Sequence, residues 1–180
     1  MKSIIFLDRD GTLNRDYGYV HSVKNFEWMP GVIESLRSLT SLGYEFVIVS
    51  NQSGIARGLF SWNDLLKLES WMISNLKGAG VDVLGCWYCP HHPDHTGICH
   101  CRKPSARLLN LALEKYNGDV KSSWMVGDTL GDLRAAKAAG LQAAGVLTGK
   151  DPSAIQNEAY SLFANLEDFV SYLKKGVINT

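Results

Sequence analysis

The sequence has no excess of charge of either sign. Its 180 residues include 18 Lys and Arg against 18 Asp and Glu, so the formal net charge at pH 7 is zero. A nucleic-acid or anionic-membrane partner usually requires a basic surface, and we therefore expect neither kind of partner. A small molecule is the default ligand for such a chain.

Long hydrophobic runs are missing as well. The N-terminus has only the short apolar run Ile4–Leu7 before Asp8, which is far shorter than a signal-peptide core or a membrane span. We therefore expect a cytoplasmic protein. In that reducing compartment, the four cysteines are better candidates for metal binding or core packing than for disulfides.

Glycine-rich nucleotide-binding motifs are also missing, because no Gly-x-Gly-x-x-Gly follows a strand and no Walker motif occurs. The chain instead alternates short apolar runs with amphipathic segments. Strands are expected at 4–7, 45–50, 81–88, 123–126 and 143–147. Helices are expected at 32–42, 61–76, 105–113 and 130–139. An apolar run at 162–163 and a helix near 168–174 follow. This alternation predicts an α/β fold with a parallel sheet flanked by helices, in one domain spanning 1–180.

Two aspartates directly follow the first expected strand. Asp8 ends it and Asp10 comes two residues later, at the sheet edge where α/β folds bind ligands. Asp10-Gly11 also has a purely structural interpretation, because Asp-Gly is a common turn dipeptide. Two like charges so close together are usually tolerated only around a cation or a proton, which favours a reactive pair.

Other strand ends carry matching chemistry. The strand 45–50 ends in Ser50, whose hydroxyl suits phosphate oxygens together with nearby backbone N–H groups, although a generic Ser-Asn turn explains the same residues. Lys103 stands just before the expected helix at 105, with Ser105 as its cap. An ammonium there would supply the positive charge that phosphoryl transfer needs.

A magnesium site is predicted from Asp8, Asp128 and the backbone carbonyl of Asp10. Asp128 ends the strand 123–126, and Mg²⁺ prefers hard oxygen ligands while keeping several waters. Asp132 lies one helical turn further on. We expect it to be a charge at the helix N-terminus or a support for the ligands.

Cysteine and histidine crowd a short segment: Cys86, Cys89, His91, His92, His95, Cys99, His100 and Cys101. Structural zinc takes four such ligands tetrahedrally, and the pairs Cys89-x-His91 and Cys99-x-Cys101 form the best quartet, in a loop at about 89–101. The other three histidines are spare candidates, and Cys86 is expected to pack as an apolar side chain. An exposed loop with free thiols is the alternative.

The segment between Asn14 and Pro30 is polar and aromatic without a clean period. A long loop at the ligand edge of a sheet often determines specificity, although a surface excursion has the same composition. We predict that substrate contacts come from Asp16, Tyr17, Gly18 and Tyr19 of this loop, and from Asn51, Gln52 and Ser53 after the second strand.

The string Asp8-Arg9-Asp10-Gly11-Thr12 resembles the first signature motif, Asp-x-Asp-x-Thr, of the haloacid dehalogenase (HAD) superfamily of phosphatases. Ser50, Lys103 and Asp128 follow in the order of the remaining motifs. The resemblance implies that Asp8 is the nucleophile and Asp10 the general acid and base. Ser50 and Lys103 would stabilise the phosphoryl group. A Rossmann-like fold is implied, and the interval between Ser50 and Lys103 leaves no room for a large cap domain.

Longer stretches at 8–12, 16–21, 50–58, 89–93 and 99–104 together resemble the D-glycero-D-manno-heptose 1,7-bisphosphate 7-phosphatase family, over about 4–150. The family's Cys-x-His and Cys-x-Cys pairs bind zinc. Arg102 matches its substrate-recognising arginine, whose fork suits a second phosphate. The implied role is a phosphatase step toward ADP-heptose and the lipopolysaccharide core. A short cysteine loop and Thr129, where relatives often carry Lys, depart from the pattern and bear on substrate affinity.

Two alternatives stay open. Histidinol-phosphatases share this architecture and many of these motifs, so histidinol phosphate is the second candidate substrate. Phospho-aspartate receiver domains also use an Asp, Mg²⁺, a hydroxyl and a Lys, but they are switches. Asp10, an acid and base two residues from Asp8, argues for hydrolysis instead. A monomer is expected because no long unexplained apolar surface is evident.

Overall fold

The computed structural model describes residues 1–156 and 160–178. Six parallel strands form one sheet in the order β3-β2-β1-β4-β5-β6. The strands are β1 (Ile4–Leu7), β2 (Glu45–Asn51), β3 (Val83–Cys89), β4 (Trp124–Gly127), β5 (Gln142–Val146) and β6 (Ser161–Phe163). The predicted parallel α/β fold is thus confirmed.

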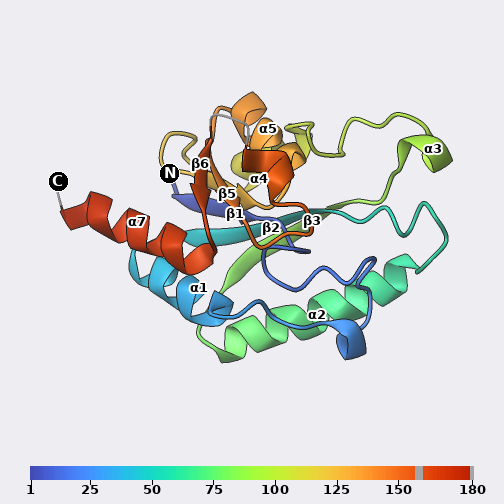
Figure 1. The fold of residues 1–180 in the computed structure, drawn as a ribbon, viewed down its shortest axis with the longest axis horizontal. Helices are drawn as coiled ribbons and strands as arrows, with labels where there is room; N and C mark the ends of the chain where they lie inside the picture. Colours follow the sequence, from blue (N-terminus) through green and yellow to red (C-terminus); the bar gives the residue numbers. More distant parts are fainter. Residues whose placement is uncertain (157–159, 179–180) are drawn as a thin grey trace.

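Helices cover both faces of the sheet (Figure 1). They are α1 (Val32–Ser41), α2 (Trp62–Gly78), α3 (Pro93–Thr96), α4 (Arg107–Tyr116), α5 (Leu130–Ala139), α6 (Ser153–Gln156) and α7 (Leu166–Ile178), and a 3₁₀ turn, η1 (Val23–Asn25), lies in the loop before α1. One face carries α1, α2 and α7, and the other carries α4 and α5.

The strand β1 lies in the middle of the sheet, and this position explains why all four of its residues are apolar. Ile5 and Leu7 pack into the core shared with α1, α2 and α7, whereas Ile4 and Phe6 pack into the core on the side of α4 and α5. Successive side chains of a strand point to opposite faces, so a strand covered on both faces must be apolar at every position. Burial of each such side chain contributes about 1.5 to 3 kcal/mol.

The strand order reverses direction at β1, and this places the site. The chain builds β2 and β3 on one side of β1, then returns to build β4, β5 and β6 on the other. The register pairs Leu7 with both Ile48 and Val126, so the strand ends that carry Asp8, Ser50 and Asp128 meet at one edge. Ligands of open α/β sheets bind at such a switch point.

Several predicted boundaries are wrong by a few residues. The third strand begins at Val83 rather than at Val81. The helix expected at 105–113 is α4, which begins at Arg107 with Ala106 at its N-cap. Ser105 does not cap it, because Ser105 Oγ donates to the His100 carbonyl oxygen (2.6 Å) and accepts only the Arg107 N–H from the helix (3.2 Å). The apolar run at 162–163 lies in β6, a three-residue edge strand that pairs with β5.

No large cap is inserted among the described residues. The chain between β1 and α1 contains only η1, and the chain between β2 and α4 contains α2, β3 and the short α3. The cavities at the strand ends are therefore bordered by loops.

Among the described residues, no helix is both long enough and apolar enough to cross a membrane.

Candidate active site

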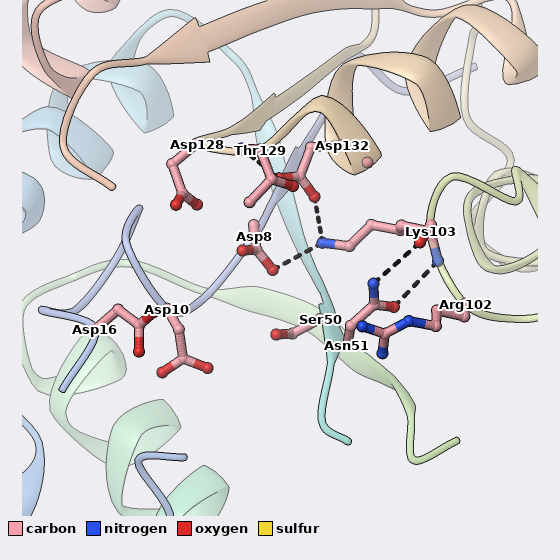
Figure 2. Close-up of a pocket in the computed structure, with 11 residues that line it drawn as sticks. Asp8, Asp10, Asp16, Ser50, Asn51, Arg102, Lys103, Asp128, Thr129 and Asp132 are labelled. Carbon is pink, nitrogen blue, oxygen red and sulfur yellow. Dashed lines mark hydrogen bonds and ion pairs between the residues drawn. The ribbon is translucent and has the colours of Figure 1, made fainter. Parts of the chain in front are cut away.

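The predicted nucleophile lies beside a buried lysine. The Lys103 ammonium is 2.7 Å from Asp8 Oδ1 and 2.5 Å from Asp132 Oδ1 (Figure 2). It also donates to the Val49 carbonyl oxygen at 2.6 Å. All three ionised side chains are buried. Burial opposes the charge on Lys103, but the Asp132 and Asp8 carboxylates outweigh that effect and raise its pKa well above the usual range. Lys103 is therefore a fixed cation against Asp8.

Asp132 supports this arrangement from the start of α5. Its Oδ2 accepts the Thr129 N–H (3.0 Å) and the Thr129 hydroxyl (2.6 Å), which forms a capping box at the helix N-terminus. Its Oδ1 faces the Lys103 ammonium. The structure thus places Asp132 both as a helix N-terminal charge and as a partner of the site lysine.

Three carboxylates, those of Asp8, Asp128 and Asp132, have oxygens that lie within 4.8 Å of one another. Burial, together with the charges of Asp8 and Asp132, raises the pKa of Asp128 to about 9. Burial raises the pKa of Asp8 to about 6, although the Lys103 ammonium opposes the shift. One ammonium does not balance three buried carboxylates, so the donor set fits a hard divalent cation such as Mg²⁺.

Three side chains from two parts of the chain donate hydrogen bonds to Asp10. The Arg9 guanidinium donates to both carboxylate oxygens (2.9 and 2.7 Å), Asn14 Nδ2 donates to Oδ1 (3.0 Å), and Gln52 Nε2 donates to Oδ2 (2.8 Å). Arg9 is buried and also donates to the Val20 carbonyl oxygen. These bonds fix the predicted acid and base at the border of the cavity.

The residues at the end of β2 and directly after it make different contacts. Ser50 lines the cavity with Asp8, and its Oγ accepts a hydrogen bond from Gln52 Nε2 at 3.0 Å. Asn51 lines the cavity too, but its side chain bonds the backbone of Lys103. Gln52 is buried and contacts Asp10, while Ser53 lines a neighbouring cavity. The sequence predicted all four as site residues without distinguishing these contacts.

The predicted zinc quartet comes together in space. Donor atoms of Cys89, His91, Cys99 and Cys101 lie within 4.8 Å of one another, at the end of β3 and in the loop that follows. Burial raises the pKa of the Cys89 thiol, so metal binding there would displace a proton. The donor set of one imidazole and three sulfurs fits a structural zinc site.

The spare candidates have other partners. Arg57 donates to His92 Nε2 at 2.8 Å and to His95 Nε2 at 3.2 Å. His100 is not among the clustered donor atoms, and its backbone carbonyl oxygen accepts a hydrogen bond from Ser105. Cys86 packs against the core of β1, and burial raises the pKa of its thiol to about 12, as expected of an unreactive side chain.

Arg102 connects the cysteine loop to the cavity. Its Nη1 donates to the His91 carbonyl oxygen at 3.2 Å, and its side chain lines the same cavity as Asp8 and Lys103 (Figure 2). This cavity has a volume of about 350 Å³. Folding of the cysteine loop therefore determines where both Arg102 and Lys103 lie.

The loop after β1 contributes three of its four predicted residues. Asp16 borders the cavity of Asp8, and Gly18 and Tyr19 line a second cavity of about 300 Å³ beside it. Tyr17 is mostly exposed, and its hydroxyl donates to Glu27, away from both cavities. Its aromatic character suggested a pocket residue, but in this loop its ring faces solvent.

Sequence reasoning assigned no contact to several residues that reach the site, Thr12 and Lys150 among them, besides Arg9 and Asn14 next to Asp10. Thr12 Oγ1 donates to Asp128 Oδ1 at 3.3 Å, and Lys150 lines the second cavity. Lys150 follows the fifth expected strand, so the strand-end argument applied to Asp8 and Asp128 would have singled it out. Its ion-pair partner Asp16 lies far away in sequence, and no pattern indicated that contact.

The fold and this acidic site, with its buried lysine, define a hydrolase of the HAD type, and residues 100–169 match the HAD-hydrolase-like family model. A D-glycero-beta-D-manno-heptose-1,7-bisphosphate 7-phosphatase from Pasteurella multocida is 49% identical over 143 residues, covering 77% of this chain and 78% of that protein. The Escherichia coli K12 protein of that name is 43% identical over 179 residues, covering 95% and 93%.

A solved structure agrees. The crystal structure of D,D-heptose 1,7-bisphosphate phosphatase from B. bronchiseptica, complexed with magnesium and phosphate, matches with a TM-score of 0.88 and 31% identity, covering 97% of this chain and 99% of that one. The chain belongs to the family of D-glycero-beta-D-manno-heptose-1,7-bisphosphate 7-phosphatases.

Proposed function

We propose that the protein is a magnesium-dependent phosphatase that removes the C7 phosphate of D-glycero-D-manno-heptose 1,7-bisphosphate. The observation that carries this proposal is the Asp8 carboxylate, 2.7 Å from the buried Lys103 ammonium in a polar cavity. The names of the curated relatives support the sugar bisphosphate as substrate and specify its β anomer. The step belongs to ADP-heptose synthesis for the lipopolysaccharide core.

In the first step, an Asp8 oxygen attacks phosphorus. The bond between Asp8 and phosphorus forms while the bond from phosphorus to the C7 oxygen breaks, and Asp10 donates a proton to that oxygen. At neutral pH the Asp8 carboxyl, whose pKa is about 6, is mostly ionised and able to attack. Lys103 and Ser50 face the charge that accumulates on the phosphoryl oxygens.

In the second step, Asp10 takes a proton from water, whose oxygen attacks phosphorus and releases Asp8 and inorganic phosphate. The bonds from Arg9, Asn14 and Gln52 keep the Asp10 carboxylate in place for both proton transfers. Asp8, Asp128 and the Asp10 carbonyl would hold Mg²⁺. That ion supplies positive charge against the carboxylates and the phosphoryl group.

Substrate selection is assigned to the residues around the reacting groups. Arg102 lines the cavity of Asp8, and its guanidinium suits the second, non-reacting phosphate at C1. Asp16, Gly18, Tyr19 and Ser53 border the two cavities, where sugar hydroxyls would lie. Zinc, bound by the quartet that ends at Cys101, would fold the loop that carries Arg102.

We also propose that residues 1–180 act as one domain and that the protein is a monomer in the cytoplasm. The monomer is proposed because the sequence shows no long unexplained apolar surface. Reducing conditions in the cytoplasm would keep the zinc-binding thiols free. Light scattering at the assay concentration tests the oligomeric state. Activity that appears only on dimerisation would contradict the monomer.

Phosphate release in magnesium buffer tests the proposed function. The values of kcat/KM are compared for both anomers of heptose 1,7-bisphosphate and for histidinol phosphate, with Asp8→Asn as the inactive control. We expect a strong preference for the β bisphosphate, and Arg102→Ala should reduce that preference. A preference for histidinol phosphate would contradict the proposed substrate but not the proposed mechanism. Absence of turnover on all of these substrates would favour a phospho-aspartate switch.

A further inference from the structure

Thr148, Gly149 and Lys150, which follow β5 after Leu147, lie next to the site in succession. Thr148 Oγ1 donates to the Gly11 carbonyl oxygen at 2.7 Å. The next residue, Gly149, lies so close to Asp128 that an added Cβ would be 2.1 Å from Asp128 Oδ2. This segment is therefore packed against both the loop after β1 and the end of β4.

Lys150 then reaches the loop between β1 and α1. Its Nζ is 3.1 Å from Asp16 Oδ1, and the same oxygen accepts the Gly18 N–H at 2.8 Å. Gly18 and Tyr19 both have positive φ angles, 83° and 52°, which are strained for Tyr19. Asp16 is thus held on one side by the backbone turn of its own loop and on the other by Lys150.

Asp16 occupies the border between the two cavities. The first cavity holds the proposed reacting groups, the second adjoins it, and Asp10, Asp16 and Asn51 line both. Lys150 is the cationic side chain among the described residues that line the second cavity. A substrate that extends beyond its reacting phosphate would meet Asp16 there.

The negative charge of the first cavity means that the pairing of Asp16 matters for substrate binding. The first cavity carries five carboxylates and two cations: Asp8, Asp10, Asp16, Asp128, Asp132, Arg102 and Lys103. An unpaired Asp16 would repel an anionic substrate and would be free to change rotamer. With Lys150 beside it, the Asp16 carboxylate is compensated and can still accept hydrogen bonds from a hydroxyl group.

We propose that Lys150 is a positioning residue that holds the Asp16 carboxylate as the acceptor for a hydroxyl group of the substrate. This inference rests on the proposed function, because it requires a polyhydroxylated substrate that extends past its reacting phosphate. The Lys150 side chain is 58% exposed, and exposed ion pairs contribute little to folding stability. Its effect should therefore be visible in substrate binding.

The test is a double-mutant cycle with Lys150→Ala, Asp16→Asn and both together, measured on heptose 1,7-bisphosphate. We expect Lys150→Ala to raise KM about fivefold to tenfold, with kcat changed less than about twofold, a difference of roughly 1 to 1.4 kcal/mol. Lys150→Arg should restore KM. In the Asp16→Asn background, Lys150→Ala should add no further effect.

Two comparisons make the result specific. First, the ratio of kcat/KM for the bisphosphate to kcat/KM for p-nitrophenyl phosphate should fall in Lys150→Ala. Second, the control variant Lys121→Ala, at an exposed lysine, should change neither this ratio nor KM for the bisphosphate. An unchanged KM, or additive effects in the cycle, would overturn the positioning role. A wild-type protein that hydrolyses p-nitrophenyl phosphate but not the bisphosphate would contradict the proposed function instead. Because histidinol phosphate carries no free hydroxyl group, turnover of histidinol phosphate alone would overturn the proposed role of Asp16 as well.

Discussion

Asn51 and Lys103 are joined by two reciprocal hydrogen bonds. Asn51 Nδ2 donates to the Lys103 carbonyl oxygen at 3.2 Å, and the Lys103 N–H donates to Asn51 Oδ1 at 3.1 Å (Figure 2). The pair connects the end of β2 to the segment that follows the cysteine loop. It fixes the backbone from which the Lys103 side chain reaches Asp8.

Removing this connection should reduce catalysis without changing the reacting groups. We expect Asn51→Ala to lower kcat on p-nitrophenyl phosphate by about 10- to 100-fold, the usual cost of losing a residue that orients a site group. Asn75→Ala, on the exposed side of α2, is the matched control and should retain activity. Wild-type kcat in Asn51→Ala would mean that Lys103 holds its position without Asn51.

The stability of the magnesium-free protein should fall as pH rises. The folded-state pKa values of Asp8, about 6, and Asp128, about 9, lie above the ordinary value of 3.8. Ionisation of these groups therefore disfavours the folded state, and the stability present at low pH is lost as pH rises through both values. We expect Tm to decrease between about pH 5 and about pH 9, and Mg²⁺ to raise Tm more at the higher pH.

Asp128→Asn provides the control for this pH dependence, because an amide does not titrate. The decrease between about pH 7 and about pH 9 should be smaller in this variant, and Mg²⁺ should no longer restore Tm. A wild-type Tm that rises with pH in the absence of magnesium would show that these carboxylates do not destabilise the folded site.

Loss of one zinc ligand should disturb the conformation of the cysteine loop while the rest of the fold stays intact. We expect Cys101→Ser to release zinc, measured by elemental analysis, and to lower kcat/KM because Arg102 and Lys103 follow directly. Cys86→Ser is the control, since Cys86 packs in the core and lies outside the quartet. Unchanged zinc content in Cys101→Ser would contradict the proposed ligand set.

Gly149 should be required for magnesium binding. An alanine there would place Cβ 2.1 Å from Asp128 Oδ2, so the carboxylate must move. We expect Gly149→Ala to raise the Mg²⁺ concentration for half-maximal activity by about tenfold or more. Gly78→Ala, at the end of α2 with nothing near its Cβ position, should leave this concentration unchanged. An equal value in both variants would contradict a ligand role for Asp128.

Much of the fold could be predicted because its main elements carry strong local signals. The helix 130–139 has the predicted bounds, since Gly140 ends it in a left-handed conformation. The apolar run of β1 indicated a strand buried on both faces. The edge strand β6 was missed, because three residues give no period that separates a strand from a loop.

The site could be predicted as a set of residues but not as a set of contacts. Asp8 and Asp128 follow apolar runs, so the parallel sheet alone brings them together. The bond from Asn51 to Lys103 and the ion pair of Lys150 with Asp16 depend on how loops far apart in sequence pack. Such packing leaves no local pattern, and composition alone does not separate Tyr17, which is mostly exposed, from Tyr19, which lines a cavity.

The most direct test of the central claim is to trap phosphate on Asp8. In Asp10→Asn, p-nitrophenyl phosphate should still react, because its leaving group needs no protonation, while hydrolysis of the phospho-enzyme should be slow without a base. We predict a burst of one equivalent of p-nitrophenolate per enzyme and a mass increase of one phosphoryl group on the peptide that contains Asp8. Product release by Asp10→Asn without any phosphorylated Asp8 would contradict Asp8 as the nucleophile.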